Sequence, residues 1–113
     1  MSAYRNILFG ILGNDNELRR AAEAELSQLQ KSNPKESLFA LVQELTSQEP
    51  EIRSLSAVLL RGTLIRKEYM WKQLSTVELN SIRGQLLHSL SIETESYVLH
   101  KKVELGMFPC QNT

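Results

Sequence analysis

The sequence contains little of what marks a specialised environment or ligand. One cysteine in 113 residues excludes an internal disulfide framework and is typical of a reducing cytosolic or nuclear compartment. Thirteen basic residues balance thirteen acidic ones, so the chain lacks the basic excess expected of a nucleic-acid-binding surface. The apolar run at residues 7–12 is far shorter than the roughly 20 residues of a membrane span. We therefore expect no membrane insertion and no direct nucleic-acid partner.

An internal repeat is the most informative feature that is present. Residues 17–26 (ELRRAAEAEL) correspond to residues 51–60 (EIRSLSAVLL), displaced by about 34 residues. Each copy opens with an acid, an aliphatic residue and an arginine, and then places apolar or small residues three and four apart, as on one helical face. A repeat of this length is typical of helical solenoids.

Helix-start signals divide the chain into segments. Asn33 precedes Pro34, and Glu36 follows at the third helical position, which predicts a capping box. Ser75 to Glu78 and Asn14 to Glu17 have the same spacing, and Pro50 suits the first turn of another helix. No pattern of β-strands competes. We expect helices at about 3–12, 15–31, 34–47, 50–67, 76–91 and 95–105.

Short connections between these helices predict three antiparallel pairs that stack in order, an all-α solenoid of HEAT-like repeats. The first helices share an apolar pattern: Leu41, Val42 and Leu45 correspond to Leu8, Phe9 and Leu12 and to Leu86, Leu87 and Leu90. The aromatic segment 68–74 interrupts the second and third pairs and is expected to fold down as a plug. We expect one helical region over residues 1–105 and a frayed tail at 106–113, since glycine and then proline end the last helix.

No group of residues predicts an enzyme, a metal site or a cofactor. His88 lies between leucines on a helix and favours a structural role. Cys110 follows a proline in the tail, with no histidine at near spacing, so an incidental thiol is favoured over a nucleophile. Glu93 and Glu95 resemble a carboxylate pair, but residues two apart on a helix point away from each other, so we expect both to be solvated.

In order and spacing, residues 17–104 resemble the N-terminal HEAT repeats of importin-β-like karyopherins, the nuclear transport receptors. The resemblance is carried by Arg20 to Leu26, Asn33-Pro34, Arg53 to Leu64, Trp71 with the helix that Ser75 opens, and Lys101-Lys102-Val103. It implies a non-enzymatic receptor fragment in the cytoplasm and nucleus that binds the GTP form of the GTPase Ran, while cargo protein binds through a longer parent chain. The chain departs from the family after Val103, where further repeats would follow, and we expect a fragment, a truncated gene model or an alternative product.

The resemblance also implies where Ran would bind, because second helices line the concave face in the family. With Ile52, Leu55, Ser56, Leu59 and Leu60 expected in the core, the other faces of that helix carry the candidate protein-binding residues Ser54, Ala57, Val58, Arg61 and Ile65. The 34-residue displacement adds Glu23, Ala24 and Ser27. Exposed apolar groups beside arginine suit a recognition surface.

Alternatives to this interpretation stay open. The basic groups formed by Arg61, Arg66 and Lys67 and by His100, Lys101 and Lys102 are also typical of plain solvated surface. A HEAT-type scaffold subunit of a protein complex would use the same helices with no dependence on Ran. A short product without any binding function is a third option. Dependence of binding on the nucleotide state of Ran would distinguish a Ran-binding receptor from a scaffold subunit.

Overall fold

The computed structural model describes residues 3–66 and 71–103, and in those ranges every regular element is a helix. The all-α prediction is confirmed. The helices are α1 Ala3–Leu12, α2 Asn16–Ser32, α3 Pro34–Glu44, α4 Pro50–Arg66, α6 Thr76–Ile92 and α7 Ser96–Val103. None of the helices in the described ranges is both long and apolar enough to span a bilayer. The expected frayed tail at 106–113 lies outside the described residues.

Of the three predicted helix caps, the one at Ser75 is as predicted and the other two differ from the prediction. The hydroxyl of Ser75 accepts the backbone N–H of Glu78 at 3.1 Å, and the Glu78 carboxylate accepts the backbone N–H of Ser75 at 2.8 Å, so this capping box is confirmed. At the start of α2 the cap is Asp15, one residue later than predicted. Its carboxylate accepts the N–H groups of Glu17 and Leu18. Both caps satisfy backbone donors that have no partner within the helix.

The capping box predicted at Asn33 is wrong, because the Asn33 side chain makes no capping hydrogen bond. Asn33 is the single residue between α2 and α3, and its backbone serves both helices. Its N–H donates to the carbonyl of Leu29 at 2.8 Å, while its carbonyl accepts the N–H of Ser37 at 2.9 Å. Pro34 occupies the first turn of α3 as predicted, where its missing N–H costs nothing.

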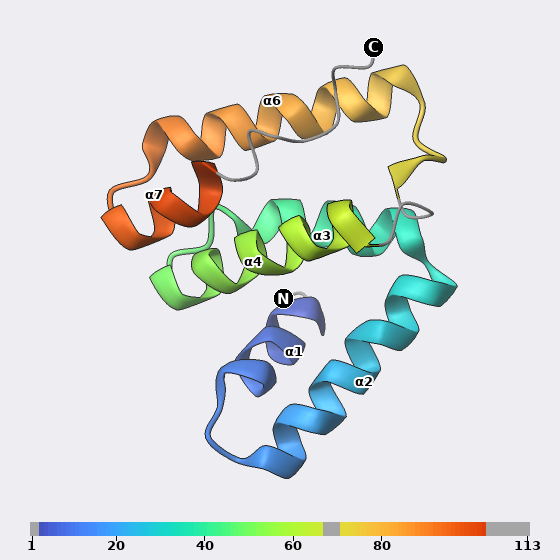
Figure 1. Cartoon of the computed structure of the whole chain (residues 1–113), viewed down its shortest axis with the longest axis vertical. Coiled ribbons are helices and arrows are strands. Elements are labelled where there is room, and N and C mark those ends of the chain that lie inside the picture. Colours follow the sequence, from blue (N-terminus) through green and yellow to red (C-terminus); the bar gives the residue numbers. More distant parts are fainter. Residues whose placement is uncertain (1–2, 67–70, 104–113) are drawn as a thin grey trace.

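The helices form three successive pairs, with α3 and α4 in the middle (Figure 1). The first pair, α1 and α2, lies on one side of the middle pair, and α6 and α7 lie on the other. Beyond their partners within each pair, α3 contacts α1, α2 and α6, and α4 contacts α1 and α7. The middle pair is therefore covered on both sides, and each outer pair on one side only.

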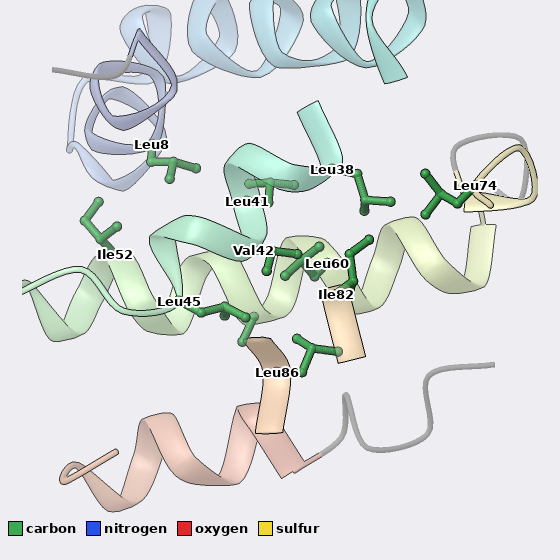
Figure 2. Packing of buried hydrophobic residues seen from close by; sticks show 11 residues of the cluster. Leu8, Leu38, Leu41, Val42, Leu45, Ile52, Leu60, Leu74, Ile82 and Leu86 are labelled. Carbon is green, nitrogen blue, oxygen red and sulfur yellow. The ribbon is translucent and has the colours of Figure 1, made fainter. Parts of the chain in front are cut away.

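Burial follows this arrangement. Figure 2 shows the main apolar cluster around the middle pair, which contains Leu8, Leu38, Leu41, Val42, Leu45, Ile52, Ala57, Leu60, Leu74, Ile82 and Leu86. Burying one such leucine or isoleucine contributes about 1.5–3 kcal/mol. Val42 is buried, but its counterparts in the outer pairs, Phe9 and Leu87, are 46% and 61% exposed. Equivalent positions in the repeat thus differ because only the middle pair has neighbours on both sides.

A smaller cluster joins α1 to α2 through Tyr4, Ile7, Ala22 and Leu26. The two helices cross closely at Gly10, where an added Cβ would lie 3.0 Å from the Cβ of Ala22. Leu59 of α4 is half-buried and packs against both clusters. It therefore links the first pair to the middle of the molecule.

The aromatic segment before α6 is only partly described, since residues 67–70 lie outside the described ranges. In its described part Leu74 is buried and Trp71 packs against the main cluster. These two side chains agree with the prediction that the segment folds down onto the helices.

Candidate functional site

A groove with a volume of about 380 Å³ lies between α2 and α4. We call it the α2–α4 groove. From α2 it is lined by Glu23, Leu26, Ser27 and Gln30, and α1 adds Ile11. From α4 it is lined by Val58, Leu59, Arg61, Gly62, Thr63 and Arg66. These residues recur three and four apart along each helix, so each helix offers one continuous face to the groove.

Four of the eight predicted protein-binding residues line this groove. Glu23 and Ser27 come from α2, and Val58 and Arg61 come from α4. Glu23, Val58 and Arg61 are exposed, and Ser27 is half-buried. The structure thus brings together residues that the 34-residue repeat had related only in sequence.

The other four predicted residues do not line the groove. Ala24 is exposed on another face of α2, and Ser54 is half-buried near the start of α4. The prediction that Ala57 is exposed is wrong, because Ala57 has no exposed surface and belongs to the main cluster. Its burial follows from the position of α4, which packs against α1, α3 and α7 and therefore buries more than one stripe. The side chain of Ile65 lies outside the described residues.

A buried polar pair joins the two walls of the groove. The amide nitrogen of Gln30 donates to the hydroxyl of Thr63 at 3.4 Å, and both residues are 3% exposed. Buried polar side chains normally require such partners. The sequence patterns did not predict this pair. A usable signal existed, because Gln30 and Thr63 are 33 residues apart, close to the displacement of the repeat.

The groove combines apolar and charged surface. Leu26 is buried, Leu59 is half-buried, and Val58 exposes 46% of its surface. Glu23 supplies a negative charge from α2, and Arg61 and Arg66 supply positive charges from α4. Gly62 leaves open space, since the nearest atom to a Cβ built there is the end of the Arg66 side chain at 3.9 Å. A surface of this composition suits another polypeptide, because arginine and apolar groups are both favoured at protein interfaces.

A second cluster of charged side chains is buried at the junction of α4, α6 and α7. The Arg53 guanidinium donates to both carboxylate oxygens of Glu93, each at 2.9 Å, and the Lys102 ammonium lies 2.7 Å from Oε1 of Glu93. The prediction that Glu93 and Lys102 are solvated is wrong. Burial alone would raise the pKa of the Glu93 carboxyl, but hydrogen bonds from Arg53 and Lys102 outweigh it and lower the pKa to about 2.

This charged cluster is satisfied within the chain. Arg53 also donates to the carbonyl of Ser47, Lys102 donates to the carbonyl of Ser89, and Glu93 accepts the backbone N–H groups of Thr94 and Glu95. The cavity beside it has a volume of only about 100 Å³. The cluster therefore holds three helices together, and the α2–α4 groove is the better candidate for binding.

Within residues 3–66 and 71–103, no group of three or more histidine, cysteine, aspartate or glutamate side chains could hold a metal ion. His88 and His100 are both exposed on helices. Cys110 lies outside the described ranges. Comparisons of the chain with protein-family models, with curated proteins and with solved structures found no match.

Proposed function

We propose that this chain is a protein-binding helical module of the importin-β-like type, whose α2–α4 groove contacts the GTP form of Ran. The observation that supports this most directly is the meeting of Glu23, Ser27, Val58 and Arg61 in one groove. They come from the second helices of two successive pairs, the helices that the family resemblance associates with Ran.

We also propose that the three pairs form the start of an α-solenoid. Two contacts support this arrangement: α3 packs against α6, and α4 packs against α7, so first helices meet first helices and second helices meet second helices in these two pairs. In such an array each pair contacts only its neighbours. The complete burial of Leu41 and Leu45 in the middle pair fits that expectation.

The proposed mechanism is mutually exclusive binding. Ran-GTP engages the second helices near the amino terminus, and cargo protein engages a longer parent chain. Binding of one partner then lowers the affinity for the other by the same factor, as linkage requires. The receptor would shuttle between cytoplasm and nucleus, where the nucleotide state of Ran differs. Nothing in this mechanism requires a catalytic group or a cofactor.

Titration calorimetry of the chain with Ran loaded with a GTP analogue, and separately with GDP, tests the proposal. We expect much tighter binding of the GTP form. Arg61→Glu should weaken that binding by on the order of 1–3 kcal/mol if Arg61 faces an acidic group of Ran. Arg20→Glu is the matched control, because Arg20 is exposed on α2 but does not line the groove.

Equal affinity for the two nucleotide states, or no binding of either, would reject the Ran proposal. The scaffold interpretation would then remain, in which the helices organise a protein complex without Ran. Equal effects of Arg61→Glu and Arg20→Glu would show that net charge, and not the groove, governs binding.

A further inference from the structure

The two ends of the α2–α4 groove carry different charges. The hydrogen bond between Gln30 and Thr63 fixes which parts of the two helices face each other. Glu23 lies about two helical turns before Gln30 on α2, and Arg66 lies about one turn after Thr63 on α4. At a rise of about 1.5 Å per residue, Glu23 is about 10 Å from Gln30 along α2, and Arg66 is about 4.5 Å from Thr63 along α4.

Apolar side chains also line the groove. Ile11, Leu26, Val58 and Leu59 line it, and Val58 is the most exposed of the four. Arg61 adds a second positive charge on the α4 wall. An apolar side chain of a partner could cover Val58 and remove its exposed surface from water, which contributes about 25 cal/mol per Å² buried. A carboxylate of the same partner would be attracted to the arginines and repelled by Glu23.

We propose that the α2–α4 groove binds a segment of a partner protein in which an apolar residue is followed, on one side only, by acidic residues. The apolar side chain packs on Val58, the acidic side chains lie toward Arg66, and Glu23 disfavours the reversed orientation. This inference rests on the proposed function, because it takes the groove to be a protein-binding surface. It adds the chemistry and the direction of the segment that occupies the groove.

The test uses two synthetic peptides of 12 residues that share a central leucine pair and differ on one side, where one carries three aspartates and the other three lysines. Each peptide is titrated into the uniformly ¹⁵N-labelled chain, and amide shifts are followed by NMR. We expect the aspartate peptide to bind about three- to tenfold more tightly and to shift the amides of Ser27 and Gly62. Arg66→Gln should reduce this preference, and Arg66→Glu should reduce it further.

Arg20→Glu again serves as the control and should leave the preference of the wild type unchanged. Equal affinity of the two peptides, no binding of either, or shifts confined to residues outside the groove would overturn the proposed occupant. The same holds if Arg20→Glu and Arg66→Glu have equal effects. A peptide preference without any binding of Ran would reject the Ran proposal alone, whereas Ran-GTP binding without a peptide preference would reject only this inference.

Discussion

The ammonium of Lys102 lies 2.7 Å from a carboxylate oxygen of Glu93, and neither side chain is more than 1% exposed. The two residues belong to the last helix of the described chain and to the turn that precedes it. Arg53, on α4, binds the same carboxylate through both of its oxygens. One carboxylate thus connects the third helical pair to the middle pair, and its removal would leave two cations without their partner.

Glu93→Gln should therefore destabilise the protein strongly. Removal of one member of a buried ion pair typically costs about 3–5 kcal/mol, because the remaining charge stays desolvated. The matched control is Glu95→Gln, an exposed carboxylate two residues away, which should change stability by less than about 0.5 kcal/mol. Urea denaturation followed by circular dichroism measures both. The double variant Glu93→Gln with Lys102→Met should lose less than the single variant, and equal losses would contradict the proposed charge balance.

The same carboxylate makes stability depend on pH. The pKa of Glu93 is about 2 in the folded protein, against an ordinary value of 4.5. As the pH falls, the Glu93 carboxylate takes up a proton at a higher pH in the unfolded chain than in the folded protein. The contribution of Glu93 to folding stability is therefore fully present above about pH 5 and is lost as the pH falls toward 2. The difference amounts to about 3 kcal/mol. Urea unfolding of wild type and Glu93→Gln across this range should give converging free energies, and parallel curves would refute the assignment.

These buried charges also show where sequence patterns stop being informative. Arg53 and Glu93 are 40 residues apart, and their contact depends on how α7 packs against α4. Charged residues on a short helix are usually solvated, so local reasoning placed Lys102 at the surface. The alternation of acids, aliphatic residues and arginines located the helices well, because that pattern depends on neighbours within one or two turns.

The sequence also predicted some helix caps correctly and others wrongly. The prediction succeeded at Ser75, where a loop precedes the helix and the hydroxyl is free to turn back to Glu78. It failed at Asn33, where one residue must end α2 and begin α3 and its backbone is already committed to both. Spacing alone does not distinguish these situations, since both sequences place an acceptor three residues before a glutamate.

The contrast predicts unequal effects of two alanine substitutions. Ser75→Ala removes a real cap and should cost about 1 kcal/mol, within a typical range of about 0.5–2 kcal/mol. Asn33→Ala removes no capping hydrogen bond and should cost less than about 0.5 kcal/mol. Thermal denaturation would separate them, because 1 kcal/mol shifts the Tm of a domain of this size by about 4–8 °C. A larger shift for Asn33→Ala would mean that its side chain has a partner in solution.

The sequence predicted only some of the residues that line the candidate groove. The repeat relates Glu23, Ala24 and Ser27 to Ala57, Val58 and Arg61, and of these six residues Glu23, Ser27, Val58 and Arg61 meet in the groove. Ala57 was misassigned because the pattern assumed one buried stripe on α4, whereas α4 has neighbours on three sides. The number of neighbours is a property of the packed molecule and cannot be obtained from the periodicity of one helix.

Adjacent residues of α4 should therefore separate stability from binding. Leu59 packs against both apolar clusters, so Leu59→Ala should cost about 2 kcal/mol, the lower end for a leucine truncation because the side chain is half-buried. Val58 exposes 46% of its surface in the groove and belongs to neither apolar cluster, so Val58→Ala should change the free energy of unfolding by less than about 0.5 kcal/mol. The same Val58→Ala variant should nevertheless bind Ran-GTP and the aspartate peptide more weakly, because it removes apolar surface that the partner would cover. Urea denaturation and titration of each variant measure the two properties independently. A Val58→Ala variant that is destabilised while Leu59→Ala is not would place the other face of α4 against the core and remove the groove as a binding surface.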